Sequence, residues 1–204
     1  MKSAATPQDL LALPSSARDL LFHEARTAHT FTAEPVGDDL VEAIHRLIRS
    51  APTSLNSQPL RGLLVRSEQA RERLVERMAP NNRAKTRQAP LTAILAADLD
   101  FHDTLPRLVP HLPGARELFA DAPVRHEAAL LNASLQIGYF ILGVRAAGLA
   151  AGPMSGFDAD AVTEEFFPGR ECRPLVVVNI GRPGPDAFRP RGPRLEFSEV
   201  FRTV

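Results

Sequence analysis

The stretch from Ala128 to Ala147 constrains this chain more than any other part of it, because it is largely apolar and has the length to cross a bilayer. Asn132, Gln136 and Arg145 interrupt it. A polar or charged group at bilayer depth is costly and rare. We therefore predict a long helix that is buried inside the protein or between two subunits, and other elements that cover it.

Hydrophobic spacing and turn residues predict the remaining elements. Apolar residues recur at helical spacing from Asp38 or Asp39 to Ser50, which indicates an amphipathic helix. Further helices are predicted at 15–25 with Ser15 or Ser16 as N-cap, at 67–78 with Ser67 as N-cap, in fragments at 101–119, at 124–147 and at 158–167. Apolar runs of strand length cover 60–66, 91–97 and 174–180. Helices with a few dispersed strands and no linker indicate one α+β domain over residues 1–204.

Charge and cysteine content exclude several classes of protein. The 24 Lys and Arg residues balance 24 Asp and Glu residues, so nothing favours nucleic acid or an anionic membrane as partner. The single cysteine, Cys172, excludes a disulfide within one chain and a cysteine-based zinc site, and it fits a reducing compartment. The N-terminal segment, with Pro7 and Asp9, lacks the apolar run of a signal peptide. We expect a cytoplasmic protein.

Several catalytic motifs are absent from the sequence. It contains neither a G-x-G-x-x-G fingerprint nor a Walker A motif. His23 and His126 are each followed by Glu, but no second His stands four residues later, so no metal site is predicted. Ser155 does not stand in a nucleophile elbow, because the spacing of the preceding glycine is wrong.

Four separated segments make chemical sense together. They read Arg26-Thr27-Ala28-His29-Thr30-Phe31, Ala51-Pro52-Thr53-Ser54-Leu55-Asn56-Ser57-Gln58-Pro59, Asn82-Arg83-Ala84-Lys85 and Pro153-Met154-Ser155-Gly156-Phe157. A basic tail with Arg189, Arg191 and Arg194 follows. Together they resemble the nitroreductase-like flavoprotein family, from about Arg26 to the C-terminus. The turn S-x-N-x-Q-P is the most specific part. The chain is most similar to the malonic semialdehyde reductase branch from pyrimidine degradation, at 26–27, 134–136, 152–158 and 191–195.

The resemblance implies a fold, an assembly and a cofactor. The fold is a central, mainly antiparallel sheet flanked by helices, with a long buried helix and a C-terminal arm exchanged in a homodimer. FMN is expected at the subunit interface, with NADPH or NADH as electron donor. The implied cofactor-binding residues are Arg26, Thr27, His29, Thr53, Ser54, Asn56, Asn82, Lys85, Pro153, Met154, Ser155, Gly156, Arg191 and Arg194. No catalytic side chain and no metal are implied, because atom N5 of FMN carries the chemistry.

Physical chemistry suggests a role for each segment. Arg26 and the tail arginines suit the FMN phosphate, because guanidinium groups pair two oxygens at once; a solvated surface arginine is the alternative. Ser54 and Asn56 offer donors and acceptors for the ribityl chain and the ring edge, or simply form a turn. Asn82 and Lys85 share one helical face. The resemblance places them by the pyrimidine edge, where a cation stabilises the reduced flavin. A backbone N–H near Ser155 would donate a hydrogen bond to atom N5 of the flavin.

The chain departs from the family pattern in ways that bear on the phosphate. Ala28 and Thr30 stand where many relatives carry Ser and a basic residue. Either His29 or the tail arginines compensate for the missing basic residue, or this chain binds the FMN phosphate more weakly than those relatives do. Many relatives carry Glu at the position of Ser155, and Leu60 replaces an aromatic residue. The chain contains no tryptophan that could stack on the flavin.

The expected activity is transfer of hydride from NAD(P)H, through FMN, to a small carbonyl compound. The branch implies malonic semialdehyde, which would become 3-hydroxypropionate. Nitroaromatics, quinones and enals are alternative substrates. A flavin-binding protein without turnover is the alternative from another class, and the missing basic residue at Thr30 is its main support.

Overall fold

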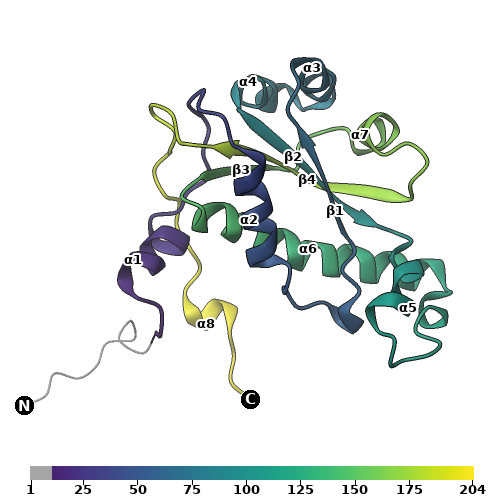
Figure 1. Ribbon diagram of the computed structural model, residues 1–204. Coiled ribbons are helices and arrows are strands. Elements are labelled where there is room, and N and C mark those ends of the chain that lie inside the picture. Colours follow the sequence, from purple (N-terminus) through teal and green to yellow (C-terminus); the bar gives the residue numbers. More distant parts are fainter. Residues whose placement is uncertain (1–10) are drawn as a thin grey trace, which may run out of the picture.

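The computed structural model describes residues 11–204 and centres on an antiparallel sheet of four strands (Figure 1). The strand order is β1-β2-β4-β3. The strands are β1 Leu60–Val65, β2 Leu91–Asp98, β3 Ala150–Met154 and β4 Cys172–Gly181. Together with the flanking helices, this sheet confirms the α+β class and the central antiparallel sheet that the resemblance implied. The N-terminal segment that argued against a signal peptide lies mostly outside the described residues.

Strand β2 is buried on both faces, which explains its continuous run of apolar residues. Successive side chains of a strand point to opposite faces. Ala93 and Leu95 join one hydrophobic cluster, which includes residues of α2 (Asp38–Ile48) and α6 (Ala122–Ala146). Ile94 and Ala96 join a second cluster, with residues of α3 (Glu68–Arg77) and α7 (Ala159–Phe166). Helix α4 (Pro80–Gln88) packs beside α3. The sheet is therefore the middle layer of three.

Helix α6 is the long helix that the sequence predicted. The Asp121 carboxylate caps it by accepting a hydrogen bond from the Val124 N–H over 3.0 Å. Its 25 residues span about 37 Å at the usual rise. It crosses one face of the sheet and packs closely on α2, since a Cβ at Gly143 would lie 2.6 Å from the Ile48 side chain. By length and composition alone α6 could cross a membrane, but in the fold it covers the sheet.

Two expectations about local structure were wrong. The first helix begins after Pro14 and carries no serine cap: α1 covers Ser15–Arg18 and continues as the π-helix η2, Asp19–His23. Strand β3 was missed altogether, because its sequence Ala-Ala-Gly-Pro-Met lacks β-branched residues. An edge position tolerates Pro153, since one row of its backbone groups has no strand partner. The Ser67 cap of α3 and the Asp158 start of α7 are confirmed.

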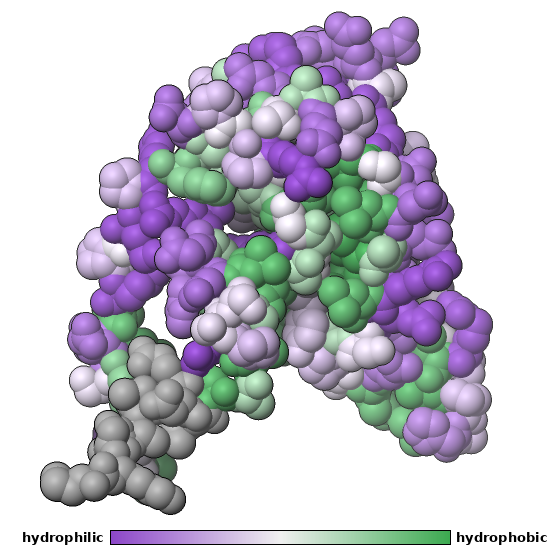
Figure 2. Space-filling model, turned by 60° about the vertical axis from the view of Figure 1, so that its left-hand side comes forward, coloured by the Kyte–Doolittle hydropathy of each residue, from purple (hydrophilic) through white to green (hydrophobic). Residues whose placement is uncertain are grey.

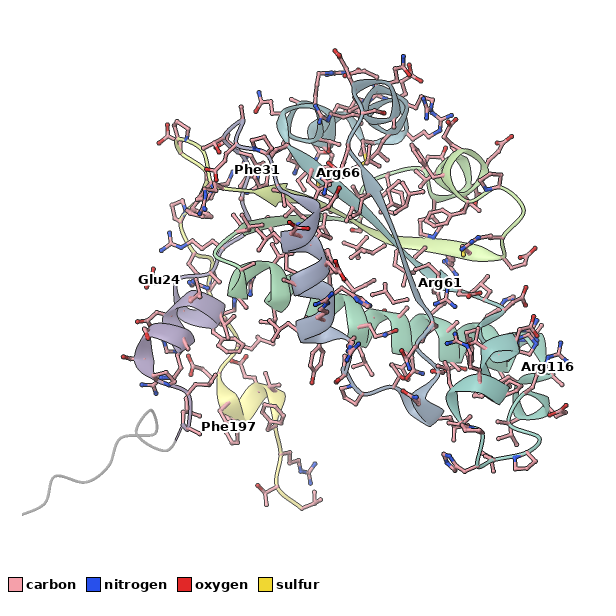
Figure 3. All side chains as sticks on the ribbon, in the orientation of Figure 1. Glu24, Phe31, Arg61, Arg66, Arg116 and Phe197 are labelled. Atoms are coloured by element: carbon pink, nitrogen blue, oxygen red, sulfur yellow. The ribbon has the colours of Figure 1, made fainter. Side chains whose placement is uncertain are left out.

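The remaining elements are short, and the chain ends in an exposed arm. They are η3 Ser54–Asn56, η4 Phe101–Thr104, α5 Leu105–Leu108, η5 Glu117–Phe119 and α8 Phe197–Val200. The arm, residues 182–204, leaves β4 and passes the C-terminal end of α6 before α8 (Figure 1). Figure 3 shows Phe197 on α8, away from the sheet, with 75% of its surface exposed. The arm therefore presents apolar side chains that its own subunit does not cover.

Candidate functional site

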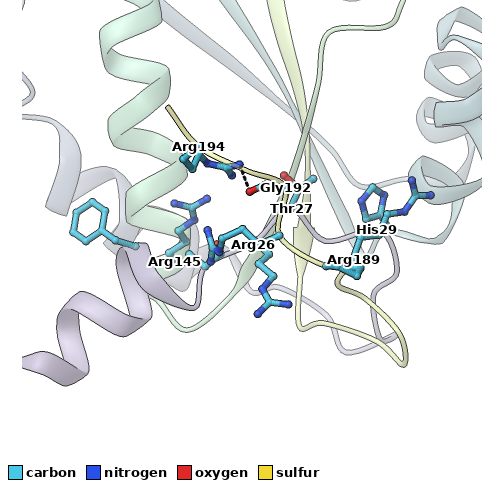
Figure 4. A pocket seen from close by; sticks show the side chains of 11 residues that line it. Arg26, Thr27, His29, Arg145, Arg189, Gly192 and Arg194 are labelled. Carbon is cyan, nitrogen blue, oxygen red and sulfur yellow. Dashed lines mark hydrogen bonds between the residues drawn. The ribbon is translucent and has the colours of Figure 1, made fainter. Parts of the chain in front are cut away.

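A strongly cationic pocket opens between the loop 25–29, the end of α6 and the arm (Figure 4). Its volume is about 400 Å³. It is lined by Phe22, Ala25, Arg26, Thr27, His29, Arg145, Arg189, Pro190, Arg191, Gly192 and Arg194. No Asp or Glu belongs to this lining, within the part of the chain that the structure describes. We call this cavity the arginine pocket.

The loop that carries Arg26 is held from both sides by backbone contacts. The Ala28 N–H donates to the Ala151 carbonyl on β3 over 3.1 Å, and the His29 N–H donates to the Ala187 carbonyl on the arm over 2.9 Å. Gly152 permits this approach, because a Cβ there would lie 2.7 Å from the Ala28 carbonyl oxygen. The missed strand β3 thus forms the floor on which the loop rests.

Arg145 and Arg191 anchor the preceding segment of the pocket wall. Arg191 donates to the carbonyl oxygens of His23 and Ala25. Arg145 donates to the Leu21 carbonyl over 3.0 Å. Burial, and then the nearby Arg191, holds the pKa of Arg145 below its ordinary value. An arginine remains charged through such a shift, so both residues add positive charge as well as structure.

Arg26 has the features of an incomplete anion site. Its Nε is buried without a hydrogen-bond partner among residues 11–204, and the Glu24 carboxylate is 3.8 Å from its Nη2. Within the same described part of the chain, Arg194 donates only to carbonyls of its own turn, Gly192 and Pro193, each at 3.0 Å. An unsatisfied buried donor costs free energy, whereas a bidentate anion would satisfy it strongly. The donor set of the pocket therefore fits a phosphate dianion.

His29 and Lys85 extend this positive region towards α4. Burial first, then Arg189 and Lys85, lowers the pKa of His29. Burial first, then Arg189, lowers the pKa of Lys85. Both shifts have the same two causes: burial disfavours the charged form, and neighbouring cations disfavour it further. The predicted residues Arg26, Thr27, His29, Lys85, Arg191 and Arg194 are thus brought to one region.

The segment Met154–Gly156 is tied to α4. The Asn82 amide donates to the Gly156 carbonyl over 2.8 Å, and the Ala79 N–H donates to the same oxygen over 3.0 Å. The Met154 side chain is buried in the core, and Ser155 is exposed. A ligand beside this segment would therefore meet the backbone and the Ser155 side chain, rather than the Met154 side chain.

A network of buried polar side chains, which the sequence analysis missed, connects α4 to the sheet. The Thr92 hydroxyl donates to the Asn179 side-chain oxygen over 2.9 Å, and the Asn179 amide donates to the Thr86 hydroxyl over 3.4 Å. Thr86 also lies 3.9 Å from the Met154 sulfur. Buried polar groups are stable only when paired in this way. This network fixes the position of α4, and with it the position of Lys85.

The turn that holds Thr53, Ser54 and Asn56 lies elsewhere in the subunit. The Ser54 N–H donates to Asn132 of α6 over 2.7 Å, and Asn56 donates to the Leu108 carbonyl over 3.2 Å. Asn132 lies about 20 Å along α6 from Arg145 of the arginine pocket. The structure therefore does not bring this turn together with the other predicted site residues within one chain.

The same turn has an unusual backbone. Leu55, Asn56 and Gln58 have φ values of 51°, 51° and 43°. Non-glycine residues rarely adopt this left-handed conformation, and such strain concentrates at functional sites. The Thr53 hydroxyl accepts a hydrogen bond from the Gln58 N–H over 3.2 Å and helps to hold the turn. The turn is thus held in a shape that its residues would not adopt unaided.

The structure explains both departures at the phosphate end. Ala28 is 1% exposed, so its side chain cannot reach the pocket. The Thr30 hydroxyl donates to the Pro185 carbonyl over 2.6 Å and is therefore occupied. Arg189 and Arg145 supply permanent cations instead. The sequence analysis missed Arg145 and Phe22 as pocket residues; the signal for Arg145 was a lone charge near the end of an apolar helix.

Comparison with known proteins gives a consistent picture. The model of the Nitroreductase family matches residues 23–182. A Streptomyces griseus protein named NADH dehydrogenase/NAD(P)H nitroreductase is 59% identical over 195 residues, which cover 95% of this chain and 99% of that protein. A Leptothrix cholodnii protein of the same name is 48% identical over 187 residues, covering 91% and 95% of the two chains.

Solved structures agree on the fold. The nitroreductase ydfN of Bacillus subtilis superposes with a TM-score of 0.81 at 22% identity, covering 94% of this chain and 100% of that one. A nitroreductase of Exiguobacterium sibiricum 255-15, solved in complex with FMN, superposes with a TM-score of 0.83 at 19% identity, covering 94% and 98%. At such identities the likeness concerns the arrangement of elements.

Proposed function

We propose that this chain, which belongs to the nitroreductase family, reduces a small aldehyde with electrons from NADPH or NADH. It is an FMN-dependent oxidoreductase: its relatives carry NAD(P)H nitroreductase names, and a structural neighbour holds FMN. The observation that carries the proposal is the arginine pocket, which presents several guanidinium groups and no carboxylate. When bound, FMN supplies hydride transfer from the nicotinamide to the substrate.

At the phosphate end, Arg26, Arg189 and Arg194 would bind the phosphate oxygens. Their geometry suits two oxygens at a time. Arg145 and Arg191 hold the wall of the pocket through the carbonyls of residues 21–25. Thr27 also lines the pocket and offers a hydroxyl donor. Arg26, Arg189 and Arg194 would thus contact the phosphate, while Arg145 and Arg191 hold the wall and add positive charge.

At the ring end, α4 and the segment Met154–Gly156 would position the flavin. Lys85 would stabilise negative charge on the reduced ring, because a fixed cation in a partly buried place costs no reorganisation. Asn82, bonded to the Gly156 carbonyl, would keep the backbone N–H groups of the segment in place. The residues proposed for the ring end, Asn82, Lys85 and Met154–Gly156, include no carboxylic acid. Water or a ribityl hydroxyl would then supply the proton to the product.

We propose a homodimer with FMN at the subunit interface. The separation of Thr53, Ser54 and Asn56 from the arginine pocket supports it, because two copies can bring the two groups together. Helix α6 leaves Leu131, Leu135 and Tyr139 exposed on a shared side. Self-association would bury these side chains, as in a two-fold symmetric interface.

The arm and an apolar groove support the same assembly. The groove, of about 390 Å³, lies among α2, β1 and α6, and its apolar lining includes Leu60, Leu64 and Phe140. The face turned forward in Figure 2 shows several groups of hydrophobic side chains, the largest of them right of centre. The arm carries exposed Phe197 and Phe201. Exchange of arms between subunits would cover apolar surface on both.

We propose malonic semialdehyde as the substrate, reduced to 3-hydroxypropionate. The similarity at 152–158 and 191–195 to that branch supports this choice. A substrate carboxylate would also be attracted by Lys85 and Arg189. The names of the relatives favour a second candidate, a nitroreductase of broad specificity. We place the enzyme in the cytoplasm, which the single buried, free Cys172 supports.

A visible spectrum of the purified protein tests this function. The protein, reconstituted with FMN where necessary, should be yellow, and anaerobic NADPH or NADH should bleach it. Malonic semialdehyde should then restore the colour, and a nitroaromatic compound and a quinone serve as parallel acceptors. Recolouring by these two but not by the semialdehyde would assign the broad nitroreductase activity. Protein that cannot bind FMN would overturn both candidates.

A further inference from the structure

His29 is the residue of the arginine pocket whose charge changes near neutral pH, among the described residues that line it. Backbone contacts hold this residue in place. The backbone N–H of His29 donates to the Ala187 carbonyl, and the Thr30 hydroxyl donates to the Pro185 carbonyl. The Ala28 side chain between Thr27 and His29 is buried. His29 therefore faces the pocket from a fixed backbone.

Cations from several elements lie around His29. Lys85 comes from α4 and Arg189 from the arm, and both act on the His29 ring. The other charged groups of the lining are Arg26 on its own loop, Arg145 on α6, and Arg191 and Arg194 on the arm. Burial, and then Arg189 and Lys85, lowers the pKa of His29 and so favours the neutral ring in the free protein. A phosphate dianion in the pocket would reverse this balance.

We propose that His29 takes up a proton from solvent when the phosphate monoester of FMN enters the arginine pocket, so that flavin binding is coupled to pH. The inference rests on the proposed FMN function. The proton balance of binding is as follows. The neutral His29 ring takes one proton from solvent and becomes an imidazolium ion, which pairs with the phosphate dianion. The titratable ring therefore replaces the permanent cation expected at the position of Thr30.

The coupling has a definite sign. Uptake of a proton on binding means that affinity rises as pH falls, by up to about tenfold for each pH unit. This holds between the pKa of His29 in the free protein and its higher pKa in the complex. Outside that interval the ring has one charge state in both forms. The phosphate of FMN itself protonates near pH 6, which works in the opposite direction, so measurements belong at about pH 6.5 to 8.5.

Isothermal titration calorimetry of the full chain, stripped of flavin, measures the proton directly. FMN is titrated at about pH 7 in several buffers of different ionisation enthalpy, and the slope of observed heat against that enthalpy counts protons. The wild type should take up a large fraction of one proton. His29→Asn and His29→Gln should take up none. His29→Lys should bind FMN tightly, with an affinity that stays constant over the same pH range.

Two controls isolate the phosphate and the site. Riboflavin, which lacks the phosphate, should cause no proton uptake in any variant. His111→Gln changes an exposed ring outside the pocket lining, and should keep the uptake of the wild type. Flavin fluorescence of diluted holoprotein across the pH range provides a second measurement of affinity. FMN binding without proton uptake, or with uptake retained in His29→Asn and His29→Gln, would overturn this inference alone. A wild type that does not bind FMN would overturn the proposed function as well.

Discussion

The side-chain amide of Asn82 donates to the carbonyl of Gly156 over 2.8 Å, and this contact joins α4 to the segment after β3. Lys85 stands one turn further along α4. The proposed ring cation and the backbone beside the proposed N5 position are therefore held by one interaction. The Asn82–Gly156 hydrogen bond can form only because Gly156 has no side chain that would collide with Asn82.

We predict that Gly156→Ala destabilises the protein and weakens FMN binding. A Cβ at this position would lie 2.8 Å from the Asn82 amide nitrogen and 3.3 Å from the Ala79 Cβ. Overpacking of this kind costs about 1–3 kcal/mol. Urea unfolding and FMN titration measure both effects. Gly62→Ala is the control, because its Cβ would meet Leu95 at an ordinary 3.5 Å. Equal behaviour of the two variants would show that the contact is unimportant.

Lys85→Ala should lower the reduction potential of the flavin and slow its reduction by NADPH, with a smaller effect on phosphate binding. The reason is the loss of a fixed cation beside negative charge on the reduced ring. Potentials are measured against a reference dye. Arg87→Ala on the same helix is the control, because Arg87 pairs with Glu72 at the surface. An unchanged potential in Lys85→Ala would remove Lys85 from the site.

Arg26→Met should weaken FMN binding roughly 10- to 100-fold, as expected for the loss of a charged hydrogen-bond donor. Riboflavin binding should change little, since the lost partner is the phosphate. Arg116→Met, which alters a surface pair with Asp103, is the matched control. Fluorescence titration gives both constants. If riboflavin and FMN lost affinity equally, Arg26 would have a general structural role and no phosphate role.

Leu135→Glu should convert the proposed dimer to a monomer and, with it, abolish FMN binding. Leu135 is 48% exposed on α6, and a carboxylate there would be desolvated in the proposed interface. Sedimentation velocity measures the assembly and absorbance measures the flavin. Leu118→Glu, at a residue 60% exposed on η5, should leave both unchanged. A wild type that sediments as a monomer with FMN bound would refute the dimer.

Cys172 should react slowly with iodoacetamide in the native protein. Burial first, and then Asp98, raises the pKa of this thiol, and the thiolate is the reactive form. Because the folded pKa lies above the unfolded one, stability should decrease as pH rises from the unfolded value through the folded value. Alkylation followed by mass spectrometry, with and without urea, measures the protection. Rapid native labelling at about pH 7 would contradict it.

Local sequence predicted much of the fold and part of the site. The Ser67 cap, the continuous apolar run of β2 and the length of α6 all follow from spacing and residue type, so they were predicted correctly. Strand β3 was not predicted, since its residues have little intrinsic strand propensity. They form a strand because β4 lies beside them and supplies hydrogen-bond partners. The serine cap at Ser15 or Ser16 failed because the helix begins directly after Pro14.

The sequence by itself determined which cations this chain has and which elements carry them, since both depend on residue identity and local periodicity. Only the tertiary structure decided which of them meet. Packing of α6 across the sheet brings Arg145 to Arg26 and holds the turn at Ser54 beside Asn132, about 20 Å away along the same helix. Distances between segments far apart in the chain depend on how whole elements pack, and no local pattern encodes them.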